Sequence, residues 1–483
     1  MRKILFLSLI SLIFVVACQK KHETIYIVST NDIHATIDAM PELATLVKGL
    51  EAQGEVLLVD SGDRVSGNPY VDDAEVSGMP IIDLMNAVGY DLVTLGNHEF
   101  DKGSESLKAM IRGSEFEWLC ANIESEIEGL DFAGSKVVTI AGVDLGFVGI
   151  ISTDNNGYPL GKRSSYEGIT FSDDLTTAIS ACNTISSECD FVVLLSHMGF
   201  NRDQQLAQQN AACDWVAGGH THDLKCEKIN NTHISQNNKN IRYATIAKLN
   251  IDNGTISSVE YEQVDMSTIE EDAQIRELVD KIKLSDPTLN EVVGYANADA
   301  THDGVANLTV EALRSYPYPD GFVPEVVFYH FGGVRLSEIE AGEIRRVDIL
   351  NNDPFLSTIY IGEMSAAQMA QFILDKYNSG TPENPDKESH YPYFRSNVPY
   401  QIIRGTEPTA SPDATEIDVN LDPNRKYRVA MCNYIAQSYI DQSIVDSQLH
   451  DTEISVREAL LRLIESFSES GYTPDNTLYQ TEL

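Results

Sequence analysis

Five short polar clusters in the first half of the chain carry the side chains that most often bind divalent metals in enzymes. They are Asn31-Asp32-Ile33-His34, Ser61-Gly62-Asp63, Gly96-Asn97-His98-Glu99, Ser196-His197 and Gly218-Gly219-His220-Thr221-His222. The candidate ligands are Asp32, His34, Asp63, Asn97, His197, His220 and His222. Imidazole donors favour zinc, manganese, iron or cobalt. So many donors can hold two divalent metal ions, and a pair of cations is a means of splitting phosphoesters.

The positions of these clusters predict that they converge. Each follows a run of apolar, largely β-forming residues: Thr24–Ser29, Val56–Val59, Leu92–Leu95, Phe191–Leu195 and Asp214–Ala217. Parallel strands of an α/β sheet deliver side chains to the crevice at their carboxyl ends. Asp32 and His34 alternate along one strand end, so we expect both to face that crevice. Asp63 has two oxygens with which to bridge cations about 3.5–4 Å apart.

The elements that must position the clusters alternate between strand and helix from about Glu23 to Val264. Apolar periodicity predicts amphipathic helices between buried strands, and Asn253-Gly254 marks a hairpin. Two packed sheets with helices outside would use all of these elements. We therefore predict an α/β fold, a four-layer αββα sandwich over residues 23–265.

The second half of the chain has longer loops, proline-rich stretches and amphipathic helices such as Ser365–Tyr377 and Ser455–Glu469. This texture predicts a smaller α+β domain over residues 290–483. Residues 266–289 separate the two parts, and Ser267–Leu284 has the composition of an exposed helix that begins at Ser267. We expect it to link the two domains.

Charge and cysteine content narrow the class of protein. The 483 residues carry 34 basic and 73 acidic side chains, a formal charge of −39. Such a surface argues against nucleic acid as a partner and against binding to anionic lipid through basic patches. There is no Cys-x-x-Cys pair, which argues against a thiolate zinc site. Cys182 and Cys189 could close a short disulfide loop, and free buried thiols are the alternative.

The N-terminus predicts export. Met1-Arg2-Lys3 is basic, and the apolar stretch Ile4–Ala17 is too short to span a bilayer. Val15-Val16-Ala17-Cys18 resembles a bacterial lipobox, with Cys18 as the lipidated residue. We expect residues 1–17 to be a lipoprotein signal peptide and residues 18–22 a tether. The lipid would anchor the exported protein to the membrane of the bacterial cell envelope. An ordinary secretory signal or a membrane anchor is the alternative.

The ordered set of motifs resembles the bacterial 5′-nucleotidase family of the calcineurin-like metallophosphoesterases. The stretches that carry the resemblance are TNDIHA, PELATLVKGL, VLLVDSGDRVSGNP, MNAVGYDLVTLGNHEFDKG, LLSHMG and GGHTHD. The resemblance implies one metal held by Asp32, His34, Asp63 and His222, and a second held by Asp63, Asn97, His197 and His220. It also implies a catalytic dyad of His98 and Asp101. An aspartate that fixes the imidazole tautomer would keep the ring charged, to stabilise the phosphoryl group and help the leaving oxygen depart.

The second domain carries the expected substrate contacts. Phe331-Gly332-Gly333-Val334-Arg335 is similar to a family segment that reads Asn-Gly-Gly-Ile-Arg, with the arginine near the nucleotide. Arg335 is therefore a candidate for binding phosphate, and an ion pair with Glu338 or Glu340 is the alternative.

Arg64, next to the proposed bridging ligand, could pair with a nearby carboxylate or lie on the surface. Three features depart from the family pattern. Ala35 replaces the usual glycine after the first histidine, and the loop from His34 to the following helix is short. The glycine-rich loop that orients the nucleoside in relatives is absent from Val429–Gln442. Aromatic residues that could replace it are Tyr434, Tyr439, Tyr391, Tyr393 and Phe394.

Together these features predict an exported, lipid-anchored 5′-nucleotidase. It would release phosphate from nucleoside 5′-monophosphates by in-line attack of a metal-bound hydroxide. One alternative is a 2′,3′-cyclic nucleotide phosphodiesterase or a nucleotide-sugar or pyrophosphate hydrolase that uses the same centre. Another is a surface binding lipoprotein with a vestigial metal site. The sequence does not determine the oligomeric state.

Overall fold

The computed structural model describes residues 22–154, 156–161, 163–379, 394–404, 414–440, 449–468 and 470–482. The predicted signal peptide, Cys18, Tyr391 and Tyr393 lie outside these residues, as does the side chain of Tyr439. Within the described part, no helix combines the length and the hydropathy needed to cross a bilayer.

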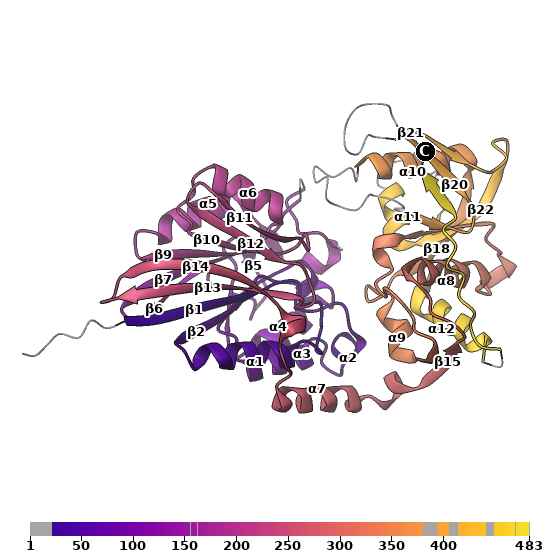
Figure 1. Ribbon diagram of the computed structural model, residues 1–483. Coiled ribbons are helices and arrows are strands. Elements are labelled where there is room, and N and C mark those ends of the chain that lie inside the picture. Colours follow the sequence, from indigo (N-terminus) through magenta and orange to yellow (C-terminus); the bar gives the residue numbers. More distant parts are fainter. Residues whose placement is uncertain are drawn as a thin grey trace, which may run out of the picture.

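Two lobes make up the molecule, and helix α7 (Ala273–Ser285) runs between them (Figure 1). The N-terminal lobe contains two six-stranded sheets. The first has, in spatial order, β14 (Ile256–Asp265), β13 (Tyr243–Asp252), β1 (His22–Thr30), β2 (Glu55–Asp60), β3 (Leu92–Thr94) and β4 (Glu117–Leu119). The second has β11 (Leu224–Ile229), β12 (Thr232–Asn237), β10 (Trp215–Gly218), β9 (Phe191–His197), β7 (Val143–Ile151) and β6 (Ser135–Ile140). Strands β1 to β4 are mutually parallel, and so are β7, β9, β10 and β12.

The central strands of each sheet are buried on both faces, which explains their nearly continuous apolar runs. Along β1, Ile25 and Ile27 face the core between the two sheets, while Tyr26 and Val28 face the outer helices. The first sheet is covered by α1 (Met40–Glu51), α3 (Met79–Val88) and α4 (Gly103–Gly113). The second is covered by α5 (Asp174–Ile185) and α6 (Phe200–Gln208). The predicted four-layer αββα sandwich is confirmed.

Some elements differ from the sequence prediction. The linker helix begins at Ala273 and not at Ser267, because Asp272 caps it by accepting hydrogen bonds from the Gln274 and Ile275 amides. The β11–β12 hairpin and the short helices α2 (Pro69–Asp72) and α6 were not predicted. β11 is a half-exposed edge strand, so it lacks the apolar run that reveals the central strands. The six described cysteines are free thiols, so the Cys182–Cys189 loop is not closed.

The smaller C-terminal lobe is built around a mixed five-stranded sheet. Its spatial order is β19 (Phe394–Ser396), β16 (Val326–His330), β22 (Lys426–Cys432), β18 (Thr358–Ser365) and β23 (His450–Ser455). Helices α8 (His302–Ser315), α10 (Ala366–Ser379) and α12 (Val456–Ser466) pack with it around one core. Smaller sheets join β20 (Tyr400–Arg404) to β21 (Ala414–Val419) and β24 (Gln480–Glu482), and β15 (Val292–Ala296) to β17 (Gly342–Arg345). The lobe is therefore α+β, as predicted.

Polar contacts join the two lobes beside the carboxyl ends of the first sheet. Arg457 Nη1 of α12 lies 2.6 Å from Asp73 Oδ2, in the loop after α2. The Tyr70 hydroxyl of α2 donates to Asn290 Oδ1 at 2.6 Å. These contacts hold the C-terminal lobe over the edge of the sandwich at which the predicted metal ligands lie.

Candidate metal centre

The polar clusters follow the carboxyl ends of five parallel strands, β1, β2, β3, β9 and β10, drawn from both sheets. Three groups of donor atoms form there, each with all of its donors within 4.8 Å of one another. The groups are Asp32, His34 and His222; His34, Asp63 and His98; and Asp63, His197 and His220. The structure therefore brings six of the seven predicted ligands together. The seventh, Asn97, directly precedes His98 in the same turn.

The first group centres on Asp32, whose side chain is fully buried. Its carboxylate accepts the His220 backbone amide at 2.9 Å and the Asn31 side-chain amide at 2.7 Å. His222 Nε2 lies 3.4 Å from Asp32 Oδ1 and 3.0 Å from His34 Nε2. The His34 Nδ1–H donates to the Ser66 carbonyl at 3.1 Å, which leaves the Nε2 lone pair facing the group. Burial, then His222 and His98, hold the pKa of His34 well below its usual value, so this ring is neutral.

Asp63 is the shared member of the second and third groups. His197 Nε2 lies 3.0 Å from Asp63 Oδ2, and His197 Nδ1–H donates to the Ser61 carbonyl at 2.7 Å. Burial alone would raise the pKa of Asp63, but His197 and then His98 outweigh it and hold that pKa well below its usual value. Asp63 is therefore ionised. It belongs to both the second and the third donor group, the position that a bridging ligand requires.

Five of the predicted ligands have left-handed backbone conformations, with φ of 50° at Asp32, 47° at His34, 58° at Asp63, 79° at His220 and 56° at His222. Such conformations are uncommon for residues other than glycine and cluster at functional sites. The prediction that alternation along a strand orients Asp32 and His34 is wrong, because β1 already ends at Thr30. The left-handed turns aim them instead. Ala35 has φ of 56°, a conformation that suits the glycine of the family pattern.

Several donor atoms of the site lack a suitable partner within the protein, and divalent cations would satisfy them. The Nε2 atoms of His34 and His222 lie 3.0 Å apart, and two imidazole nitrogens at this distance need a proton or a cation between them. The Asn97 amide oxygen is buried without a hydrogen-bond partner in the described part of the chain. A buried polar atom left in this way indicates a missing ion or ligand. Carboxylate, amide and imidazole donors in this mixture suit zinc, manganese, iron or cobalt.

His98 lies at the edge of the centre, beside the C-terminal lobe. Its Nδ1–H donates to Asp101 Oδ2 at 2.7 Å, and its Nε2 lies 3.9 Å from Asp63 Oδ2. Asp101 is fixed in turn by the Ser66 hydroxyl at 2.6 Å. Burial would lower the pKa of His98, but Asp63 and Asp101 outweigh it and raise that pKa to about 9. The predicted pair is therefore formed, with one ring nitrogen held by Asp101 and the other facing the donors.

A buried network that sequence reasoning missed fixes the two loops that carry Asp63 and Asn97. The Glu99 carboxylate accepts the backbone amides of Asp63 at 3.0 Å, Arg64 at 2.9 Å and Gly96 at 2.5 Å. The Arg64 side chain is fully buried and pairs with Asp60 at 3.0 Å and Glu99 at 3.7 Å. Of the two placements considered for Arg64, the buried one is correct. Glu99 ends the polar cluster Gly96-Asn97-His98-Glu99, but nothing in the sequence distinguishes it from a surface carboxylate.

Arg335 approaches the same centre from the other lobe. Its backbone amide donates to the Asn352 carbonyl at 3.1 Å, and its guanidinium lies 5.4 Å from the centre of the Phe355 ring. Phe355, also missed from the sequence, lies 5.8 Å from the His98 ring. In the described part of the chain, no ion pair joins Arg335 to Glu338 or Glu340. Its charge lowers the pKa values of His34 and His98, after larger contributions from other neighbours.

The aromatic candidates for stacking on a nucleoside differ in their exposure to solvent. Tyr434 is 45% exposed, and its ring lies 5.0 Å from His330. Phe394 is only 1% exposed and packs against Phe372 in the core, so it forms no aromatic wall. Of the candidates whose side chains are described, only Tyr434 can present a ring face to a ligand.

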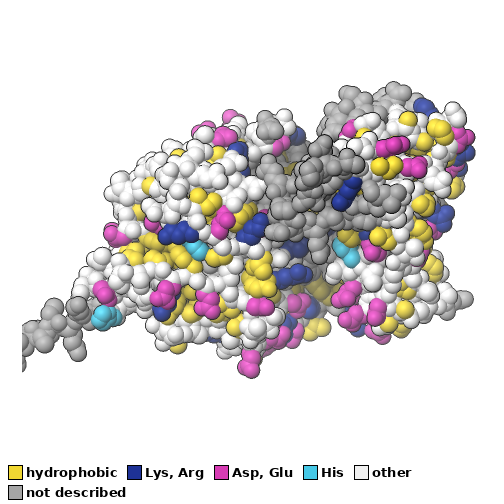
Figure 2. Space-filling model, turned by 45° about the horizontal axis from the view of Figure 1, so that its top comes forward, with side chains coloured by type: hydrophobic (Ala, Val, Ile, Leu, Met, Phe, Trp, Pro, Cys, Tyr) yellow, Lys and Arg dark blue, Asp and Glu magenta, His cyan; other side chains and the backbone are white. Residues whose placement is uncertain are grey.

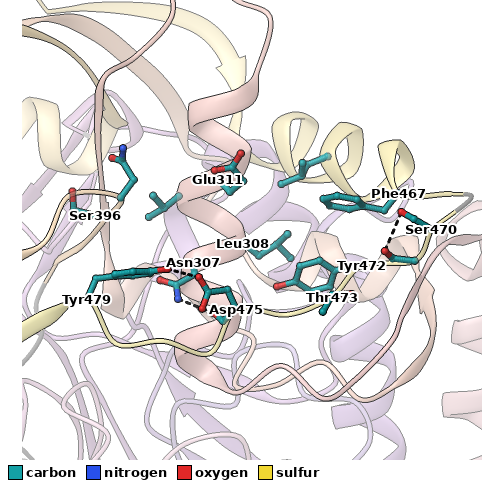
Figure 3. A pocket seen from close by; sticks show the side chains of 14 residues that line it. Asn307, Leu308, Glu311, Ser396, Phe467, Ser470, Tyr472, Thr473, Asp475 and Tyr479 are labelled. Atoms are coloured by element: carbon teal, nitrogen blue, oxygen red, sulfur yellow. Dashed lines mark hydrogen bonds between the residues drawn. The ribbon is translucent and has the colours of Figure 1, made fainter.

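A cavity of about 550 Å³ lies elsewhere in the C-terminal lobe, between α8, α12 and the C-terminal segment (Figure 3). Its polar groups satisfy one another: Asn307 donates to the Asp475 carbonyl at 2.8 Å, and the Tyr479 hydroxyl donates to the Asp475 side chain. The described residues that line it include Glu311 and Asp475 but no Lys or Arg. The cavity therefore does not fit a phosphate.

Comparisons with known proteins agree with the site and the fold. The family model of the calcineurin-like phosphoesterases matches residues 25–224, and that of the 5′-nucleotidase C-terminal domain matches residues 286–442. The trifunctional nucleotide phosphoesterase YfkN of Bacillus subtilis is 25% identical over 470 residues, which cover 85% of this chain and 31% of the relative. The 5′-nucleotidase of Bos taurus is 30% identical over 221 residues, which cover 40% of this chain and 37% of the relative. The chain thus spans about a third of the length of these relatives.

The solved structure of a 5′-nucleotidase precursor from Thermus thermophilus has the same fold, with a TM-score of 0.78 at 19% identity. The match covers 95% of this chain and 99% of that structure. The resemblance expected from the motifs is confirmed in both domains. The chain belongs to the calcineurin-like phosphoesterases that carry a 5′-nucleotidase C-terminal domain.

Proposed function

We propose that the protein is a dinuclear-metal phosphohydrolase that releases phosphate from nucleoside 5′-monophosphates. One observation carries the proposal. Two donor groups, Asp32–His34–His222 and Asp63–His197–His220, lie together after the carboxyl ends of parallel strands. The split of the ligands between two metals, with Asp63 shared and Asn97 in the second set, is part of the proposal.

The chain's own residues would each have a defined task. When bound, two cations would polarise the phosphoryl oxygens and lower the pKa of a water nucleophile. His98, oriented by Asp101 at 2.7 Å, would hold its Nε2 proton toward the phosphoryl group and the leaving oxygen. Arg335 would bind phosphoryl oxygens through its guanidinium. Phe355 lies against both the His98 ring and Arg335, and so limits where the substrate can sit.

The preference for nucleotides is supported by the relatives. The eukaryotic relatives include 5′-nucleotidases, and the Bacillus relative that covers most of this chain is a trifunctional nucleotide phosphoesterase. That second relative favours a broader alternative, in which a 2′,3′-cyclic nucleotide or a nucleotide sugar is also cleaved. Tyr434 is the candidate for stacking on the base.

We further propose export and lipid anchoring through Cys18. The basic start, the short apolar stretch and the lipobox-like end at Cys18 support this. Metabolic labelling with a radioactive fatty acid tests it: wild-type protein should be labelled, and the Cys18→Ala variant should not.

The activity is tested by phosphate release from AMP, 2′,3′-cyclic AMP, UDP-glucose and p-nitrophenyl phosphate, with manganese or zinc added and metal content measured. Preference for AMP supports the proposal, and preference for either of the diesters supports the broader alternative. No release from any of the four would instead favour a binding lipoprotein with a vestigial site. Asp63→Asn should abolish turnover, whereas Asp280→Asn, an exposed carboxylate on α7, should not change it.

A further inference from the structure

A single loop carries the chain from the second sheet back to the first, and it passes beside the metal centre. Residues 238–242 join β12 to β13. Asn238, Asn240 and Ile241 all have positive φ, between 52° and 61°. These left-handed residues on both sides of Lys239 hold it in one place, because the backbone around it has few other conformations that fit.

Hydrogen bonds fix this loop to the segment that carries the first ligands. The Asn31 side chain donates to the Asn238 carbonyl at 2.7 Å. The Asn240 backbone amide donates to the Asp32 carbonyl at 2.8 Å, and its side chain donates to the Thr36 hydroxyl at 2.6 Å. Lys239 lies between these two anchors. Its backbone position is therefore set by the same contacts that set Asp32.

The Lys239 side chain is partly buried among cations. Burial, followed by Arg335 and Arg242, lowers the pKa of Lys239 to about 8, and Asp32 opposes them. In the described part of the chain, no ion pair involves Lys239 or Arg335. Asp32 attracts both cations and Asp63 attracts Arg335, but neither carboxylate forms an ion pair with them, so a bound anion would lower the repulsion between Lys239 and Arg335.

The two cations come from different lobes. Lys239 belongs to the sandwich, and Arg335 belongs to the C-terminal lobe, where Phe355 supports its guanidinium. Figure 2 shows Lys and Arg side chains along the junction of the lobes, although the whole chain has a formal charge of −39. A local positive site in so acidic a protein requires a specific role, because the general charge would repel a phosphate.

We propose that Lys239 and Arg335 form an anion clamp at the mouth of the metal centre, in which Lys239 binds phosphoryl oxygens that do not face the metals. The clamp rests on the proposed function for its substrate. It identifies the preferred class as phosphomonoesters with two negative charges, because each cation of the clamp can pair with one of them. A phosphodiester has a single negative charge and would gain less from Lys239.

The test compares Lys239→Met and Lys239→Arg with wild type and with Lys248→Met. Lys248 follows on β13 and makes a surface pair with Glu260 at 3.7 Å, so it is a matched control. Calorimetry measures the binding of inorganic phosphate to the metal-loaded proteins, and metal content is measured in the same samples. Activity is measured with AMP and with 2′,3′-cyclic AMP.

We expect Lys239→Met to weaken phosphate binding about tenfold or more and to lower kcat/KM for AMP by a similar factor, with a smaller loss for the cyclic diester. Lys239→Arg should retain most of both, and metal content should stay unchanged. Phosphate binding within twofold of wild type in Lys239→Met would overturn the clamp, and so would loss of the metals in that variant. If wild type hydrolyses no ester but Lys239→Met still loses phosphate binding, the proposed function fails and the clamp stands.

Discussion

Replacing Glu99 with glutamine tests whether the buried carboxylate positions the metal ligands. In the structure, Glu99 Oε2 accepts the amides of Asp63 and Gly96, and Oε1 accepts the amide of Arg64. The glutamine amide group must take the place of one of these oxygens. At either place, at least one buried backbone N–H loses its acceptor.

The expected cost follows from those contacts. A buried donor left without an acceptor costs about 1–3 kcal/mol, and loss of the negative charge also weakens the pairing of the buried Arg64 guanidinium. Since Asp60 still pairs with Arg64 at 3.0 Å, we expect a total loss of about 2–4 kcal/mol in the free energy of unfolding. Because the Asp63 loop and the Gly96–Asn97 turn both loosen, metal affinity should fall about 10–100-fold.

The assay has two parts. Denaturant unfolding of the metal-free protein gives the loss of stability, and titration against a competing chelator gives the metal dissociation constants. Glu105→Gln is the control: Glu105 is an exposed carboxylate on α4 that pairs with Lys108 at 2.7 Å, and a pair in full contact with solvent contributes little to stability. If Glu99→Gln binds metal as tightly as Glu105→Gln does, Glu99 does not position the ligands.

Other perturbations test the dyad, the metals and a buried carboxyl. His98→Ala should lower turnover about a hundredfold or more. Metal content should stay near two per chain, because the His98 ring is held by Asp101 and is not one of the proposed ligands. Unchanged turnover would remove His98 from the mechanism. Chelation of the metals should lower the melting temperature, by an amount equivalent to about 2.7 kcal/mol for each site at which the free metal had been at 100 times its dissociation constant. No change on chelation would mean that the folded chain holds no metal. Burial raises the pKa of Asp203 well above its usual value, so wild-type stability should be lost as pH rises from about 4 toward the folded-state pKa. Asp203→Asn should lack this loss, and parallel pH profiles of unfolding would contradict the assignment.

The sequence by itself determined the fold class and the residues that meet. Apolar runs such as Phe191–Leu195 are buried on both faces, and that burial forces parallel strands whose carboxyl ends share one edge. The clusters after those runs could therefore be predicted to converge. The same patterns, as an ordered set of motifs, indicated the family. These are local properties of the chain, readable from periodicity and from the residue types at strand ends.

Only the tertiary structure decided how the side chains are aimed and what supports them. Residue type alone does not assign the left-handed turns at Asp32 and His34, because the cost of this conformation is offset by contacts made elsewhere in the fold. Glu99 and Lys239 are of residue types that usually lie on the surface. Their roles depend on burial and on partners that are distant in sequence. Burial changes the free energy of a charged side chain far more than the residues next to it in sequence do. A side chain becomes buried only when the chain folds.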